Sequence, residues 1–150
     1  MKKINLQDKT TAKLGKIEMY YFENENIGLE KTLFHRIYIP LTPFDSGLDY
    51  ESQPVETEIL IEWLDLELKN PTNLDGLMLT SNSKDDTEIS IYVGSTHNPC
   101  DIKSMVLRKT GEDQFEINCN LLVDFEYEEV APREVFNFKT TLILERKIKE

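Results

Sequence analysis

The chain has 150 residues, of which 39% are hydrophobic and 9% aromatic, so it is long enough to bury one core, and we expect a single domain spanning residues 1–150. Its net charge is −11, and residues 17–138 alone carry eight basic and twenty-five acidic side chains. A surface of that charge repels nucleic-acid phosphates and anionic membranes, which argues against both as partners and favours a basic protein or cations.

The N-terminus has basic residues but no apolar run behind them, so it lacks the pattern of a signal peptide. No stretch approaches the ~20 apolar residues of a membrane-spanning helix. Two cysteines, Cys100 and Cys119, fit reduced thiols better than a disulfide framework. We therefore expect a cytoplasmic protein.

Residues 1–15 are polar and rich in lysine, which predicts a flexible arm or a short edge element. Two strand patterns follow, over residues 16–23 and 33–39, where β-favouring apolar and aromatic side chains fall on two alternating faces. His35 shares its face of the second strand with apolar neighbours. We therefore interpret it as a core histidine.

Aromatic side chains fall on the other faces of these two strands, namely Tyr20, Phe22, Phe34 and Tyr38. Such a row either covers the second face of a sheet or stays exposed as a binding platform. No amphipathic helix is evident to cover it. Part of this aromatic surface is therefore expected to remain for an interface.

Residues 40–56 form the longest irregular stretch, and a loop of that length in a compact domain is usually functional or mobile. A third long strand pattern covers residues 57–68. Its apolar side chains change from odd to even positions near Trp63, which predicts a β-bulge or a sheet corner at that residue.

A polar cluster at residues 81–86 separates apolar segments at residues 77–80 and 88–93, a pattern typical of a hairpin. Another strand is expected over residues 101–109, followed by a turn. These short segments, with no long helical periodicity among them, indicate an all-β chain.

The clearest pattern covers residues 115–127, where apolar side chains occupy every odd position. It predicts a long strand that pairs with residues 135–145 as a C-terminal hairpin. The side chains expected to face the core are Phe115, Ile117, Cys119, Leu121, Val123, Phe125 and Tyr127. About eight strands result, so the predicted fold is an antiparallel β-sandwich or flattened barrel with a long C-terminal hairpin.

Few residues suggest a catalytic or metal-binding site. His97 and Cys100 have a spacing that suits two ligands of one metal ion, in what we interpret as a turn, but a zinc site needs further partners. Three acids between Asp45 and Glu51 offer a weak calcium loop without the ligand pattern of an EF-hand. We expect no metal site, no cofactor and no catalytic residues, because no nucleophile motif or phosphate loop is present.

Six acids gather on the predicted C-terminal hairpin, where they would form a partner-binding surface: Glu116, Asp124, Glu126, Glu128, Glu129 and Glu134. The other interpretation is that they only keep one face of the sheet in water. Like charges crowded on a strand are unfavourable at close range, which favours a role in binding.

The sequence thus predicts a non-enzymatic acidic protein-binding domain that captures a basic partner, in the manner of an inhibitor or an immunity protein. One alternative is a β-barrel or sandwich that binds a small molecule, or an enzyme built on one. Another is a structural subunit that pairs with its assembly through an edge strand.

Overall fold

The computed structural model describes residues 2–80 and 87–149, and most of its regular structure is extended, as the alternating sequence predicts. The strands are β1 (Gly15–Asn24), β2 (Leu29–Pro40), β3 (Glu58–Leu64), β4 (Met78–Leu79), β5 (Glu88–Val93), β6 (Thr96–Gly111), β7 (Gln114–Val123) and β8 (Glu134–Leu144). The helical turns among the described residues are α1 (Leu6–Lys9) and η1 (Glu25–Ile27).

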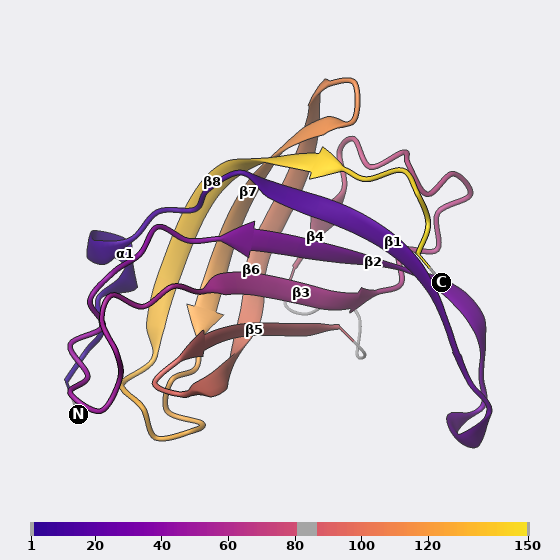
Figure 1. Cartoon of the computed structure of the whole chain (residues 1–150). Coiled ribbons are helices and arrows are strands. Elements are labelled where there is room, and N and C mark those ends of the chain that lie inside the picture. The colour runs from indigo at the N-terminus through magenta and orange to yellow at the C-terminus, as the bar shows by residue number, and fades with distance from the viewer. Residues whose placement is uncertain (1, 81–86, 150) are drawn as a thin grey trace.

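Seven of these strands close into a barrel in the order β6-β5-β3-β2-β1-β8-β7, since β7 pairs back with β6 (Figure 1). The short strand β4 adds to the edge of β6 outside this ring. Neighbours are antiparallel except β1 and β8, which are parallel. A ring with an odd number of strands cannot alternate throughout, so one parallel pair is required. The predicted all-β fold is confirmed as a barrel.

Side chains fill the interior of the barrel, as expected for a ring of about eight strands or fewer. The largest fully buried side chains include Phe115, Phe125, Phe136, Ile17, Ile37 and Ile61. The buried apolar residues form one connected cluster that extends to both ends of the barrel.

The predicted C-terminal hairpin is confirmed, with β7 and β8 paired from Gln114 opposite Ile143 to Val123 opposite Glu134. The inward row is buried from Phe115 to Phe125. The strand is shorter than predicted, however, because the chain turns after Val123. Tyr127, expected in the core, is therefore 72% exposed.

Two other strand predictions need correction. The segment at residues 77–80 does not form a hairpin with residues 88–93, because β4 pairs with β6. The polar cluster 81–86 that suggested this hairpin lies outside the described residues. The third strand ends at Leu64 instead of residue 68, although the bulge at Trp63 is confirmed.

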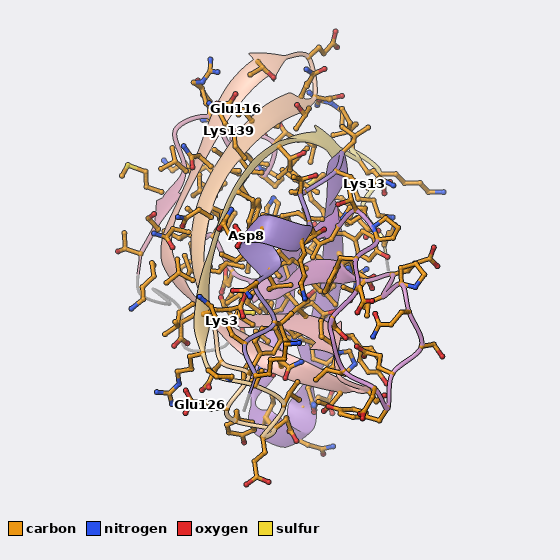
Figure 2. The ribbon with its side chains drawn as sticks, turned by 90° about the vertical axis from the view of Figure 1, so that its left-hand side faces the viewer. Lys3, Asp8, Lys13, Glu116, Glu126 and Lys139 are labelled. Carbon is orange, nitrogen blue, oxygen red and sulfur yellow. The ribbon has the colours of Figure 1, made fainter. Side chains whose placement is uncertain are left out.

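The predicted N-terminal arm is part of the core. Ile4 and Leu6 are completely buried, and α1 lies across one end of the barrel (Figure 2). The loop between β2 and β3 folds over the same end in Figure 1. In that loop the Glu51 carboxylate accepts hydrogen bonds from the N–H groups of Gly94 and Ser95 in the β5–β6 turn.

Glu134 holds the N-terminal segment in place. Its carboxylate is 5% exposed and accepts hydrogen bonds from the N–H groups of Asn5 at 3.2 Å and Leu6 at 2.6 Å. Asn5 begins α1 without a side-chain cap of its own, so the carboxylate of a distant strand satisfies N–H groups at the start of this helix.

Replacing Glu134 by glutamine should lower the free energy of unfolding by about 1–3 kcal/mol, because the amide offers one acceptor oxygen to two N–H groups, one buried and one partly buried. Urea denaturation measures this change, and amide hydrogen exchange should accelerate first at residues 4–10. The exposed Glu129→Gln is the matched control, expected within about 0.5 kcal/mol of the unmodified protein. Equal stability of the two variants would contradict this role of Glu134.

Candidate functional site

The outward side chains of β1, β2, β3, β5 and the start of β6 form one continuous surface, which we call the front face. Its side chains are those that alternate along each strand with the buried rows, together with Trp63 at the bulge. They are Glu18, Tyr20, Phe22, Phe34, Arg36, Tyr38, Leu60, Glu62, Trp63, Glu88, Ser90, Tyr92, His97, Pro99 and Asp101. The β1–β2 hairpin carries part of this face beyond the body of the barrel (Figure 1).

An aromatic cluster occupies the hairpin end of the front face. The ring of Trp63 meets those of Phe22, Phe34 and Tyr20 edge to face, with centroids 4.9, 5.4 and 5.7 Å apart. Trp63 lies at the bulge in β3 with a φ of 59°, and its N–H donates to the hydroxyl of Tyr20 in β1. Tyr38, the fourth predicted platform residue, lies apart beneath Lys16.

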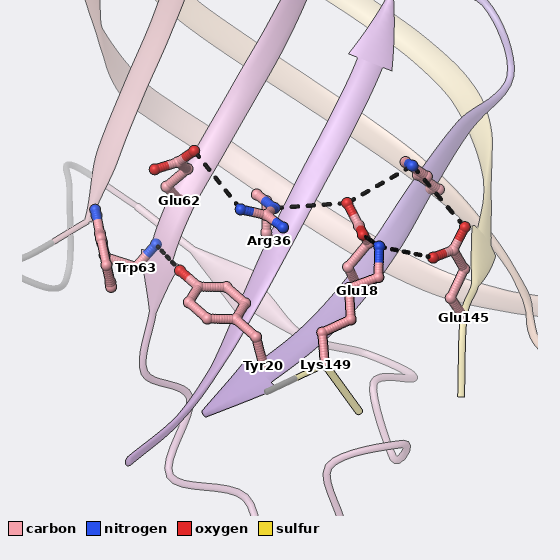
Figure 3. Close-up of polar contacts among 8 residues, drawn as sticks. Glu18, Tyr20, Arg36, Glu62, Trp63, Glu145 and Lys149 are labelled. Atoms are coloured by element: carbon pink, nitrogen blue, oxygen red, sulfur yellow. Dashed lines mark hydrogen bonds and ion pairs between the residues drawn. The ribbon is translucent and has the colours of Figure 1, made fainter. Parts of the chain in front are cut away.

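An ion-pair network lies beside the aromatic cluster (Figure 3). The Glu18 carboxylate is buried and contacts Lys149, while the Arg36 guanidinium lies 3.5 Å from Glu18 and 4.0 Å from Glu62. The same guanidinium stacks over the Tyr20 ring at 4.9 Å. Burial, opposed by the hydrogen bond from the Trp63 N–H, raises the pKa of Tyr20. An arginine on this face therefore sits between an aromatic ring and carboxylates.

Two carboxylates stand directly opposite each other on the front face. Glu62 of β3 is the cross-strand partner of Glu88 in β5. Arg36 reaches Glu62, but within the described residues no basic side chain pairs with Glu88. Like charges at directly opposite positions destabilise a sheet, so this pair retains repulsion that a cation would relieve.

Glu88 lies where two surface hollows meet. One hollow, which we call the apolar hollow because most of its lining side chains are apolar, is lined by Phe22, Asn24, Ile27, Gly28, Leu29, Phe34, Trp63 and Glu88. The other is a groove over β3, β5 and β6, lined on its polar side by Glu62, Glu88, His97, Asp101 and Tyr127. A long, partly apolar cation would find matching surface in both.

Four of the six predicted binding acids lie on the turn that borders this groove. Residues 124–129 form the turn, which the Asp124 N–H ties to the Pro99 carbonyl at 2.9 Å, and its Tyr127 lines the groove. Asp124 and Glu126 bind Arg133. Glu128 and Glu129 are exposed and make no ion pair within the described part of the chain.

The other two predicted acids do not belong to this surface. Glu116 lies toward the opposite end of the hairpin from Glu126, and it pairs with Arg108 and Lys139 (Figure 2). Placing Glu134 on an exposed surface was wrong, because its carboxylate is buried against the N-terminal segment. The six acids therefore do not form one patch.

The residues that the sequence offered as possible metal ligands do not lie together on one surface. His97 and Cys100 lie within β6 instead of the predicted turn, with His97 exposed beside Tyr92 and Cys100 buried. Both thiols are free and buried, and burial raises the pKa of Cys119 to about 12. In the described ranges, no group of three or more His, Cys, Asp or Glu side chains is arranged to hold a metal ion.

Sequence reasoning missed Glu62, Glu88 and Asp101 as surface acids of interest. The alternation already placed Glu62 and Glu88 on outward rows. Their meeting depends on β3 pairing with β5, which no local pattern indicated.

Comparison with known proteins adds no guide to function: no protein-family model matches this chain, and no curated protein or solved structure matches it significantly. None of the helices described here is long and apolar enough to cross a membrane.

His35 is a core histidine, as predicted, with 3% exposure. Its Nε2 lies 2.8 Å from the Pro71 carbonyl oxygen, which can only accept, so Nε2 carries the proton. The buried Nδ1 has no hydrogen-bond partner among the described residues. Burial lowers the pKa of His35 below its ordinary 6.5, with the bond to Pro71 opposing the shift.

The free energy of unfolding should therefore fall as pH decreases below about 6.5. The unfolded chain then binds a proton at His35 that the folded chain does not, and the slope reaches at most ~1.4 kcal/mol per pH unit. Above about pH 6.5, His35 is neutral in both the folded and the unfolded chain, so its contribution to the free energy of unfolding no longer changes with pH. Urea denaturation between pH 7.5 and 5.5 measures the slope, which His35→Gln should reduce and the exposed His97→Gln should not. An unchanged slope in His35→Gln would refute this origin.

Proposed function

We propose that this chain is a non-enzymatic protein-binding domain that captures a basic protein partner on its front face and the adjoining turn at residues 124–129. Binding would be driven by carboxylates and aromatic rings on the outer surface of the barrel. A cytoplasmic location, which suits two free thiols, is part of the same proposal.

The observation that carries the proposal is the opposed pair Glu62 and Glu88. A fold under selection for stability alone gains from replacing one of two facing carboxylates. Retaining both is favourable when a partner supplies the missing positive charge, because complementary charge accelerates encounter and fixes the orientation of the complex.

The exposed acids of the turn support the same function. Glu128 and Glu129 are exposed and follow Tyr127, which lines the groove. Their negative charge therefore also attracts a cation that approaches Glu88. Charges at the rim of an interface act mainly on the association rate.

The alternative functions have less support. A small-molecule barrel needs space in its interior, which Phe115, Phe125 and Phe136 fill here. Nucleophilic catalysis needs a nucleophile beside a base, whereas His35 binds Pro71 and His97 packs against Tyr92. A structural subunit would need a long free edge, and closure of the barrel pairs most of the strand edges.

Removing the Glu88 charge should separate stability from binding. Glu88→Gln relieves the repulsion with Glu62, so the free energy of unfolding should rise by about 0.2–1 kcal/mol while affinity for the basic partner falls. Urea denaturation and titration of the captured partner measure the two effects. Glu112→Gln removes an exposed charge in the β6–β7 turn and should change neither. A Glu88→Gln variant that is less stable and binds normally would contradict the proposal.

Reversing the charge of the turn should slow association. The double variant Glu128→Lys/Glu129→Lys leaves Glu126 to hold the backbone of Arg133, so the turn should keep its shape. The partner is first captured from a native lysate of the source cells at low salt and eluted with salt. Its association rate, measured by stopped flow at low ionic strength, should fall, and the rate should depend less on salt.

Asp8→Lys/Glu112→Lys is the matched control, since it makes the same change in net charge at exposed positions on other elements. Equal rates for the two double variants at low salt would mean that the turn is only a solvated surface.

A further inference from the structure

The apolar hollow at the base of the β1–β2 hairpin has a composition that selects one kind of side chain. It is an open space of about 550 Å³ with Glu88 and Asn24 as its polar side chains. The rest of its lining is Phe22, Ile27, Gly28, Leu29, Phe34 and Trp63. Ile27 is 73% exposed and Phe22 36%, although both are large apolar residues. Since Glu88 is the one charged side chain among these lining residues, and five of the others are large and apolar, the matching group is apolar along its stem and positively charged at its end.

The front face already contains an internal example of this arrangement. Arg36 places its guanidinium over the Tyr20 ring at 4.9 Å and within 4.0 Å of the Glu62 carboxylate (Figure 3). Trp63 and Glu88 offer the same two partners in the hollow, an aromatic ring and a carboxylate, to a group from outside. Tryptophan gives the strongest attraction to a cation among aromatic rings.

We infer that this hollow receives an arginine side chain of the basic partner, with the guanidinium against Trp63 and Phe22 and its N–H groups donating to the Glu88 carboxylate. The inference rests on the proposed function, because it names the anchor of the captured protein. Arginine fits better than lysine, since its planar guanidinium stacks on rings and binds a carboxylate through two parallel hydrogen bonds.

The charges around the hollow agree with this occupant. Glu88 faces the like charge of Glu62 across the strands, and in the described part of the chain it has no basic partner. An arriving guanidinium neutralises Glu88 and covers exposed apolar surface of Phe22 in one step. An apolar side chain would cover Phe22 but would leave Glu88 without a positive partner. It would also remove water from the carboxylate, which is unfavourable for an unpaired charge.

The test uses two blocked eight-residue peptides of equal charge, acetyl-(Arg-Gly)4-amide and acetyl-(Lys-Gly)4-amide, at low salt. Fluorescein-labelled versions report affinity by anisotropy, and unlabelled versions report contact with the hollow, because Trp63 is the only tryptophan of the chain. The arginine peptide should shift the Trp63 emission saturably and bind roughly two- to fivefold more tightly than the lysine peptide.

Two variants and two matched controls locate the effect. Phe22→Ala and Glu88→Gln should each remove the preference for arginine, and Glu88→Gln keeps the shape of the hollow if Phe22→Ala disturbs folding. Tyr21→Ala removes a side chain of equal exposure next to Phe22, and Glu23→Gln removes a charge beside it; neither residue lines the hollow, so both should keep the preference.

The outcomes separate the inference from the proposed function. If both peptides bind equally and Trp63 emission does not change, or if Phe22→Ala and Glu88→Gln keep the preference, the arginine hollow is wrong while capture of basic partners stands. If neither peptide binds, both the proposed function and the inference fail.

Discussion

The structure depends on the seam where β1 meets β8. A ring of seven strands needs one parallel pair, and this pair has only three matched positions, beginning at Gly15. A Cβ atom at Gly15 would lie 2.5 Å from the Tyr38 carbonyl oxygen and 2.8 Å from a methyl group of Leu142, so any side chain there would push the strands apart. Lys149 extends the seam through backbone hydrogen bonds with Met19 and Tyr21.

Closure at this seam separates a filled interior from the outer surface on which we propose that binding takes place. Seven strands enclose an interior that their own side chains fill, so ligands are left with the outer surface. The seam and the β2–β3 pairing both end before the β1–β2 hairpin does, which leaves residues 22–32 as a two-stranded ribbon beyond the barrel. Such a ribbon cannot bury both faces by itself. Trp63 packs against one face, and the remaining apolar surface forms the wall of the hollow.

Two groups of acidic residues differ in what they do in this structure. Glu18 and Glu134 are buried, and the fold depends on them because each has its charge satisfied, by Lys149 and by the N–H groups of the N-terminal segment. Glu88 and the turn acids Glu128 and Glu129 are exposed and unpaired among the described residues. Net charge alone does not distinguish these groups, and only the second carries charge that no ion pair among the described residues neutralises.

Period-two alternation by itself determined the inward rows of the C-terminal hairpin and the bulge at Trp63, because alternation is a local property of an extended backbone. It also placed Glu62 and Glu88 on outward rows. Only the tertiary structure decided that these two carboxylates face each other, that residues 77–80 pair with β6, and that the Glu134 carboxylate is buried beneath the N-terminus. Each of these depends on which distant segments become neighbours, and closure of the ring and packing of its ends, not any local pattern, make that choice.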